Sequence, residues 1–260
     1  YWGTGAPYDI SQEAEITNSI IKVDLDRNSD TFGEIIGQYR GEPEGYFEAL
    51  EQLPCIDLRL INGTGLKPPL LQGAGGCTNL NLDFGASVNL FPDPENPDKL
   101  LAGDGQKSGV YHIFDTETMS RRSRTILNPP SVLGGIIGNS GFDGRYIYGS
   151  SVIGGYLWSI DSVDGSIRWI SPLADLVHWG PSVALANGIL YTVDLLGFFN
   201  AVDMETGLVL FKRQMLFDIL SEFNAQALSL GATVVARNTI YATASNISAG
   251  ATLIAYRLPE

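Results

Sequence analysis

Two cysteines are the residues of this chain with the most defined chemistry. Cys55 and Cys77 lie 22 residues apart in a stretch rich in glycine and proline. A disulfide between them would fix a loop that has little regular hydrogen bonding of its own, and we expect that disulfide. The alternative is a pair of buried free thiols. A zinc site is disfavoured, because no histidine and no second cysteine pair stand at ligand spacing.

Two sequons offer a second kind of chemistry, covalent glycosylation. They are Asn62-Gly63-Thr64 and Asn246-Ile247-Ser248. Such sites are used only in a eukaryotic secretory pathway, and so short a motif also arises by chance. Asn62 and Asn246 are therefore candidate glycosylation sites.

Nucleophilic catalysis has little support in this sequence. His112 lies within a strand-like run and His178 precedes Trp179, and neither accompanies a serine or cysteine in a nucleophile context. The closest approach, Gly149-Ser150-Ser151, lacks the strand-turn-helix setting that exposes a catalytic serine. We expect both histidines to be structural, with hydrogen-bonded rings, and we expect no hydrolase.

The composition describes a folded, acidic protein. Hydrophobic residues fill 44% of the 260 positions and charged residues 17%, which suits a buried core and not a disordered chain. The formal net charge of −13 repels phosphate backbones and anionic lipids, so we expect no nucleic-acid partner. No apolar stretch reaches the ~18 residues of a spanning helix, so we expect no membrane insertion. The first residues show no leader pattern, and we do not expect Tyr1 to be the natural N-terminus.

A sequence motif that repeats at a nearly constant spacing predicts where the strands lie. It consists of glycine, a run of mostly apolar residues, aspartate and, four residues later, glycine. Strong copies run from Gly155 to Gly165 and from Gly197 to Gly207, 42 residues apart, and weaker copies end at Asp115 and Asp24. A period in the forties with strand-like content predicts β-propeller blades, because one unit alone cannot bury its hydrophobic faces.

Turn residues separate the expected strands. Asp143-Gly144 and Asn187-Gly188 predict tight hairpins, since both central residues of such turns adopt positive φ. We interpret Asp161 and Asp203 as turn formers and not as catalytic residues, because an aspartate side chain accepts backbone N–H groups in a turn. Two aromatic residues after these turns are expected to fill the space between blades: Trp169 and Phe211.

We therefore expect an all-β fold with about five blades, each a four-stranded antiparallel sheet. Residues 1–260 would form a single propeller domain. A loop-rich insertion at 41–79 interrupts the blades, and long loops inside compact domains are commonly functional. The expected blades cover residues 1–40, 80–126, 131–172, 178–215 and 222–258.

Several phrases, taken together and in order, resemble the pyrroloquinoline-quinone (PQQ)-dependent alcohol dehydrogenases, especially the branch similar to polyvinyl-alcohol dehydrogenase. The resemblance spans nearly the whole chain, and both cysteines fall in an insertion similar to that of the family. The phrases are Tyr1-Trp2-Gly3-Thr4-Gly5, Leu82-Asp83-Phe84-Gly85-Ala86, Gly105-Gln106-Lys107-Ser108-Gly109 and Gly134-Gly135-Ile136-Ile137-Gly138.

The resemblance implies a larger, seven- or eight-bladed ring of which this chain is the C-terminal part. An incomplete ring exposes two strand edges and an apolar blade face, which folded proteins seldom leave open. We therefore expect an N-terminal propeller portion or another chain to complete the ring. We also expect a secreted or periplasmic protein, which the expected disulfide and the negative charge suit.

The chemistry implied by the resemblance needs a flat quinone, a Ca²⁺ ion that polarises it and a carboxylate base. Lys107 matches the lysine that bonds the cofactor, and Asp83 is the candidate base. The alternative for Lys107 is a surface lysine at a hairpin.

Three departures from the family weaken that reading. Ala6 stands where the family has an asparagine that binds the cation, and a methyl group cannot coordinate Ca²⁺. Asn81 replaces the first of two aspartates, and if that aspartate is the base then proton abstraction fails. Ile137 replaces an aromatic residue that borders the site.

Two functional readings follow. The favoured one is a catalytically degenerate, secreted quinoprotein-like propeller that serves as a binding or structural protein, in which Lys107 pairs with a carboxylate such as Asp83. The other is a PQQ- and calcium-dependent alcohol dehydrogenase. Resemblance of fold alone does not transfer activity, because propellers host many functions.

Overall fold

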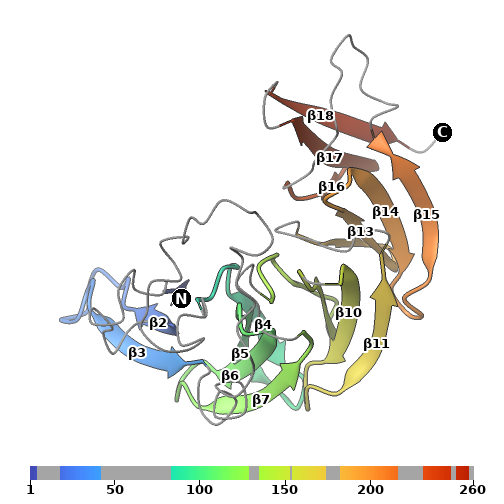
Figure 1. Ribbon diagram of the computed structural model, residues 1–260. Helices are drawn as coiled ribbons and strands as arrows, with labels where there is room; N and C mark the ends of the chain where they lie inside the picture. Colours follow the sequence, from blue (N-terminus) through green and yellow to red (C-terminus); the bar gives the residue numbers. More distant parts are fainter. Residues whose placement is uncertain are drawn as a thin grey trace, which may run out of the picture.

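The computed structural model describes residues 1–4, 18–41, 83–128, 135–152, 154–173, 182–215, 231–246 and 250–257. In these residues the strands form five antiparallel sheets that follow one another along an open arc (Figure 1). Within each sheet the strands lie side by side in chain order. The predicted all-β propeller is confirmed.

The strands of the first two sheets are β1 (Trp2–Gly3), β2 (Ser19–Val23) and β3 (Ile35–Arg40), then β4 (Asn89–Asp93), β5 (Asn96–Gly105), β6 (Val110–Asp115) and β7 (Arg121–Ile126). The third sheet holds β8 (Gly141–Phe142), β9 (Tyr146–Ser150), β10 (Tyr156–Asp161) and β11 (Ile167–Pro172). The last two hold β12 (Ala184–Ala186), β13 (Ile189–Val193), β14 (Phe198–Asp203) and β15 (Val209–Gln214), then β16 (Val234–Ala236), β17 (Thr239–Asn246) and β18 (Gly250–Arg257).

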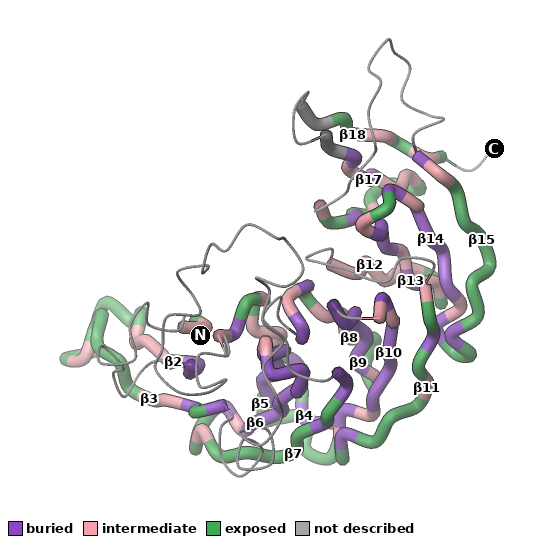
Figure 2. Tube along the Cα trace, in the orientation of Figure 1, coloured by how far each residue is buried: buried purple, intermediate pink, exposed green. Residues whose placement is uncertain are grey.

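The three middle sheets have four strands, and the first and last have three in the described part of the chain. The first strands of neighbouring sheets contact one another in the pairs β4–β8, β8–β12 and β12–β16. The fourth strands β7, β11 and β15 form the outer rim, where much of the chain is exposed (Figure 2). By the position of Asp24, β2 corresponds to the third strand of a blade, so the first sheet shows no counterpart of β4. The last sheet shows no counterpart of β7. The insertion predicted at 41–79 falls almost entirely outside the described residues.

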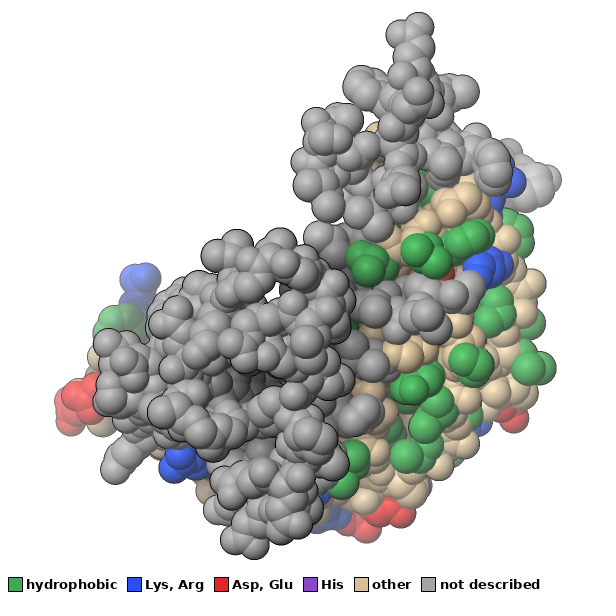
Figure 3. All heavy atoms as spheres, in the orientation of Figure 1, with side chains coloured by type: hydrophobic (Ala, Val, Ile, Leu, Met, Phe, Trp, Pro, Cys, Tyr) green, Lys and Arg blue, Asp and Glu red, His purple; other side chains and the backbone are tan. Residues whose placement is uncertain are grey.

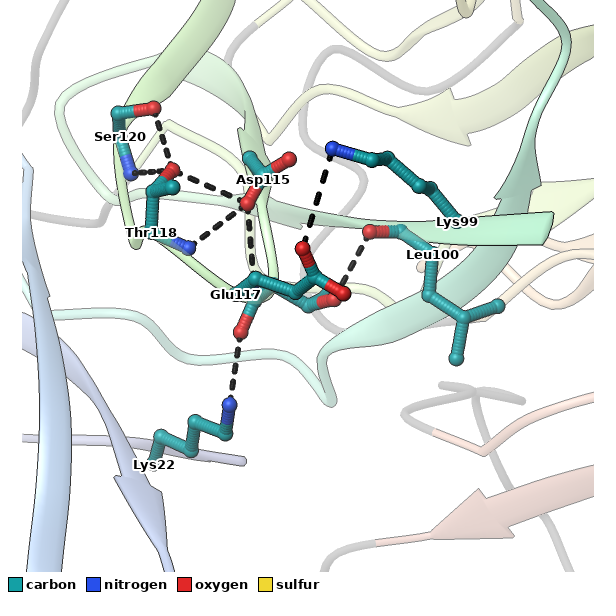
Figure 4. Close-up of polar contacts among 8 residues, drawn as sticks. Lys22, Lys99, Leu100, Asp115, Glu117, Thr118 and Ser120 are labelled. Carbon is teal, nitrogen blue, oxygen red and sulfur yellow. Dashed lines mark hydrogen bonds and ion pairs between the residues drawn. The ribbon is translucent and has the colours of Figure 1, made fainter. Parts of the chain in front are cut away.

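The predicted turn aspartates end the third strand of their blades. Asp161 and Asp203 each accept the N–H of a glycine four residues later through the backbone carbonyl, at 2.9 Å. Asp115 does the same with Met119, which takes the place of that glycine with φ of 55°. The Asp115 carboxylate also accepts the N–H groups of Glu117 and Thr118, at 2.9 and 2.7 Å (Figure 4). These hydrogen bonds stabilise the carboxylate form and lower the pKa of Asp115 and of Asp203. The interpretation of Asp161 and Asp203 as turn formers is confirmed.

A register shift recurs beside each turn. In four sheets the pairing of the third and fourth strands slips between the residues that lie two and one positions before the aspartate. Such a bulge bends the outer strand and increases its twist. The residue paired just before the slip is therefore at the same place in every blade: Gly37, Ser123, Trp169 and Phe211. We call this the docking position.

Trp169 shows what the docking position does. Its indole donates a hydrogen bond to the carbonyl of Met204 in the next blade, at 3.0 Å. A Cβ atom on Gly207 would come within 2.8 Å of the indole ring, so only glycine leaves room for it. Trp169 thus packs between blades as predicted. Phe211 contacts the ring of Phe199 but is 49% exposed, so it fills that space only in part.

Apolar clusters fill the space between each pair of neighbouring sheets. Fully buried side chains dominate them, because each sheet presents one face to the preceding blade and the other to the next. Their central members include Phe114 between the first two sheets, Trp158 between the second and third, Leu190 between the third and fourth, and Phe199 between the last two.

The two ends of the sheets carry different connections. At one end the first and second strands join through short turns such as 187–188, and the third and fourth through turns such as 204–208. At the other end the blades join one another through 41–88, 127–140, 173–183 and 215–233. We call this the long-connection end. Binding residues concentrate on loops that a rigid scaffold positions, so this is the end to search for a site.

Prediction 1 concerns the contact between Trp169 and Gly207. Both glycines have positive φ, 76° at Gly207 and 78° at Gly188, so alanine is strained at either position. At Gly207 the added Cβ would also meet the Trp169 ring, whereas nothing lies within 4 Å of it at Gly188. We expect Gly207→Ala to lower the free energy of unfolding by about 1–3 kcal/mol more than Gly188→Ala does. Urea unfolding of the two variants measures the difference, and equal losses would contradict the docking contact.

Candidate functional site

Lys107 and Asp83 meet at the long-connection end. Lys107 lies in the turn between β5 and β6, and Asp83 precedes β4 in the same blade. The ammonium Nζ donates to Asp83 Oδ2 at 2.8 Å, and the Lys107 backbone N–H donates to the Asp83 carbonyl at 3.0 Å. The two side chains are only 17% and 19% exposed. A charge-assisted bond with so little access to water is stronger than an open surface pair.

Residues next to the two members of the pair hold their segments together. Phe84 and Gln106 form an antiparallel bridge. Gly85 approaches both Lys107 and the next blade: a Cβ atom there would lie 2.8 Å from Ile137 Cγ2 and 3.4 Å from Lys107 Cε. Ile137 therefore lies beside the stem of Lys107, on the side where the resemblance implies an aromatic residue. No side chain other than glycine fits at position 85 without displacing Ile137.

A relay of hydrogen bonds links three blades beside this pair. The Ser87 N–H donates to Asn139 Oδ1 at 2.7 Å, and the Asn139 N–H donates to Ser182 Oγ at 3.1 Å. Each of the three residues lies two positions before the first strand of its blade. In each step a side-chain oxygen in one blade accepts a backbone N–H group of the preceding blade. These hydrogen bonds fix the distance between neighbouring blades at this end of the sheets.

His112 belongs to a buried polar network between the first two blades. Its Nε2 lies 3.1 Å from Gln106 Oε1, which also accepts from Ser108 Oγ at 2.7 Å. Because an amide oxygen only accepts, Nε2 carries the proton and Nδ1 accepts from Tyr39 Oη at 2.9 Å. Burial, with the charges of Arg121 and Arg124 second, lowers the pKa of His112 to about 3. The ring is neutral and structural, as predicted.

Asp104 is the cross-strand partner of His112 and is also buried. Burial raises the pKa of its carboxyl well above the usual value, although the Gly105 N–H bond lowers it. Oδ1 accepts that N–H at 2.7 Å, while Oδ2 is buried and has no hydrogen-bond partner among the described residues. A neutral carboxylic acid is the form that suits such a place.

The other predicted site residues fall largely outside the described residues. These are Ala6, Asn81, Cys55, Cys77, Asn62 and His178. Asn246 ends β17, where its backbone pairs with Gly250. Among the described residues no group of three or more metal-ligating side chains comes together, and no helix there is long and apolar enough to cross a membrane.

Sequence reasoning missed the relay and the partners of His112. Tyr39 lies 73 residues from His112, and Ser87 lies 52 residues from Asn139, so no local pattern connects them. One signal was available in the repeat. His112 and Asn200 stand three residues before the turn aspartates of their blades, and both contact the residue six positions upstream, Gln106 and Asp194.

Comparison with solved structures finds matches to part of the chain. BamB from Moraxella catarrhalis is 17% identical with a TM-score of 0.48, over 65% of this chain and 49% of BamB. A europium-containing methanol dehydrogenase is 21% identical with a TM-score of 0.38, over 48% of this chain and 22% of that one. The quinohemoprotein alcohol dehydrogenase from Comamonas testosteroni is 19% identical with a TM-score of 0.37, over 43% and 17% of the two chains.

This likeness is one of fold. The matched part is about half of BamB and about a fifth of each dehydrogenase. It does not distinguish the polyvinyl-alcohol-dehydrogenase branch from other quinoproteins. No protein-family model and no curated protein matches the chain.

Prediction 2 concerns the pH dependence that His112 confers. The unfolded ring binds a proton near pH 6.5 and the folded ring only near pH 3, so the unfolded state holds more protons between these values. The stability that neutral His112 provides is complete above pH 6.5 and is lost as the pH falls toward 3. We expect the difference in unfolding free energy between the wild type and His112→Gln to fall by about 1.4 kcal/mol per pH unit in this window.

The wild type must be compared with His112→Gln because Asp104 changes the unfolding free energy with pH in the opposite direction to His112. Its raised pKa reduces stability as the pH rises above 3.8, so the pH profile of the wild type alone mixes the two groups. Urea unfolding of both proteins between pH 4 and 7 isolates His112. A difference that stays constant with pH would show that the ring is protonated in the folded state.

Proposed function

We propose that this chain is a catalytically degenerate, quinoprotein-like β-propeller that serves as a binding or structural protein. The bond between Lys107 and Asp83 supports the proposal. The ammonium that would bond a quinone and the carboxylate that would remove a proton neutralise each other at 2.8 Å.

Three positions that the resemblance assigns to the site lack the groups that PQQ and Ca²⁺ would need. Ile137 lies against Gly85 beside the Lys107 stem, where a flat ring would need an aromatic wall. In the sequence Ala6 has no oxygen for a hard cation, and Asn81 has no basicity. These three positions agree with one another, since each removes a different requirement of the same reaction.

We propose the long-connection end as the binding face. The connections 41–88, 127–140, 173–183 and 215–233 all leave the sheets at this end, which is also the end of the second blade that carries the ion pair. Propeller blades below supply a rigid platform, and sequence between them can vary without disturbing the sheets. In this proposal the insertion at 41–79, tied by a Cys55–Cys77 disulfide, belongs to that face of the single propeller domain.

The open arc supports a further part of the proposal. We propose that an N-terminal propeller portion or another chain completes the ring, because open edges and a bare blade face are costly to leave in water. A secreted or periplasmic location suits a disulfide and, in a eukaryote, glycosylation at Asn62 or Asn246. Nucleic acid remains disfavoured as a partner by the net charge of −13.

One observation favours the alternative, a PQQ- and calcium-dependent alcohol dehydrogenase. The candidate base and the candidate cofactor lysine come from segments 24 residues apart, and they meet at one place. In an active quinoprotein these two residues would also belong to one site, where Lys107 would hold the quinone and Asp83 would accept the proton of the alcohol. The two functions therefore differ in whether the pair opens for a cofactor.

Prediction 3 tests that difference on purified native protein. We expect no PQQ in the denatured extract, no quenching of tryptophan fluorescence when PQQ and Ca²⁺ are added, and no alcohol-dependent reduction of a redox dye. Lys107→Ala serves as the matched control, since it removes the only predicted cofactor contact in the described residues. Saturable PQQ binding by the wild type that Lys107→Ala abolishes, together with dye reduction, would establish the enzyme and overturn the proposal.

A further inference from the structure

The tight turn between β12 and β13 consists of the dipeptide Asn187-Gly188. Ala186 and Ile189 pair with each other on either side of it, so the turn has no other residue. Both turn residues have positive φ, 52° at Asn187 and 78° at Gly188, and both are exposed. The asparagine amide and the backbone nitrogen that follows it therefore lie close together at the surface, where solvent reaches both.

An asparagine followed by glycine can react with its own backbone. The nitrogen of the next residue loses its proton to a base and attacks the side-chain Cγ atom, so that a new N–C bond forms and the amide group leaves as ammonia. Water then opens the resulting succinimide ring at either of its carbonyl groups. One product is aspartate, and the other is isoaspartate, in which the main chain runs through the side chain. The net reaction consumes a water molecule, releases ammonia and involves no oxidation.

The turn offers the groups and the space that this ring closure needs. Glycine has no side chain to obstruct the attack, and its permissive backbone lets the peptide plane rotate toward the amide. In the described part of the chain no hydrogen bond uses the Gly188 N–H, and a Cβ atom built at Gly188 would have nothing within 4 Å. The Asn187 side chain likewise has no hydrogen-bond partner among the described residues.

Comparable residues elsewhere in the fold lack one of these features. Within the described ranges Asn187 is the only asparagine that glycine follows. Asn238 lies in the equivalent two-residue turn between β16 and β17 and is also exposed, but the β-branched Thr239 follows it and obstructs the attack. The Asn139 amide accepts a backbone N–H of the preceding blade at 2.7 Å. Asp143 precedes a glycine, yet its carboxylate accepts two backbone N–H groups, at 2.8 and 2.7 Å.

The isoaspartate product is incompatible with this turn. A two-residue hairpin turn closes only with the backbone twist of its two central residues, and isoaspartate adds an atom to the main chain there. β12 has three residues, and its pairing with β13 begins directly at the turn. β12 also contacts β8 and β16, the first strands of the neighbouring blades, and the Gly188 carbonyl accepts the Met204 N–H at 3.0 Å. A change in the turn therefore reaches the packing of the inner strands.

We infer that Asn187 is a site of spontaneous deamidation and that its conversion to isoaspartate loosens β12 from β13. The inference is independent of the proposed function. The reacting turn lies at the end of the sheets with the short connections, whereas β12 starts at the long-connection end. The modification thus couples the age of the molecule to an inner strand that runs to the proposed binding face.

Prediction 4 follows the purified 260-residue chain during incubation at mildly alkaline pH. Peptide mapping by mass spectrometry measures the conversion of each asparagine, and methylation by an isoaspartyl methyltransferase measures isoaspartate. We expect Asn187 to convert about tenfold or more faster than Asn238 in the same sample, because only Asn187 precedes a residue without a side chain. The rate should rise with pH, since the attacking nitrogen must lose its proton. Equal rates at the two asparagines, or conversion of Asn187 only in urea-unfolded protein, would overturn the assignment.

Hydrogen exchange of fresh and aged protein tests the loosening of β12. Amide protons of β12 and β13 should exchange about tenfold or more faster in the aged protein. The outer strand β15 is the internal reference and should not change; its residues are mostly exposed, and Figure 3 shows apolar side chains on the outer strands of this side of the molecule. Unchanged exchange of β12 in fully converted protein would contradict the loosening.

Asn187→Gly is the matched control variant. Glycine keeps the positive φ of the turn and has no amide to react, so aging should leave the exchange of β12 unchanged in this variant. The sequence has a second Asn-Gly pair, Asn62-Gly63, which lies outside the described residues. Because Asn187→Gly retains that pair, faster exchange of β12 in the aged variant would show a cause other than Asn187 and overturn the inference.

Discussion

The contact between the outer strand of one blade and the left-handed turn residue of the next is the constraint on which this fold depends. It combines three local features: an aspartate that closes the turn, a bulge that aims the docking residue, and a residue with positive φ four positions after the aspartate. Trp169 on Gly207 is its fullest form, with ring packing and an indole hydrogen bond to Met204. Phe211 occupies the same position in β15, where its side chain is 49% exposed.

The two ends of the sheets carry different turns, connections and polar contacts. Short turns at one end carry the aspartates whose side chains satisfy backbone donors, and lowered carboxyl pKa values accompany those bonds. The other end carries the long connections, the relay from Ser87 to Ser182 and the bond between Lys107 and Asp83. In an acidic chain this lysine is neutralised within its own blade. These contacts stabilise the end of the sheets, and the charge of Lys107 is already compensated by a carboxylate of its own blade.

Sequence alone was sufficient where a feature is local and repeated. The period, the hairpins and the turn role of Asp161 and Asp203 follow from residues a few positions apart, and the structure confirms them. Weak copies of the repeat had local causes: Asn18 and Met119 adopt the positive φ that glycine supplies elsewhere. What sequence could not supply was the partner that each residue contacts in the neighbouring blade. The partner of His112 lies 73 residues away, and Phe211 was expected to pack as Trp169 does although the surface that would cover it is absent from the described residues. The positions Ala6, Asn81, Cys55 and Cys77 stay predictions.

The contact between the docking position of one blade and the left-handed turn residue of the next is the central claim, and an exchange of side-chain sizes between Gly37 and Met119 tests it most directly. Gly37→Trp should lower the free energy of unfolding by about 2 kcal/mol or more, because the ring meets Met119. Adding Met119→Gly should restore most of that loss, since it recreates the pair that Trp169 and Gly207 form. Urea unfolding of the wild type, both single variants and the double variant measures the coupling. Additive losses in the double variant would contradict the account.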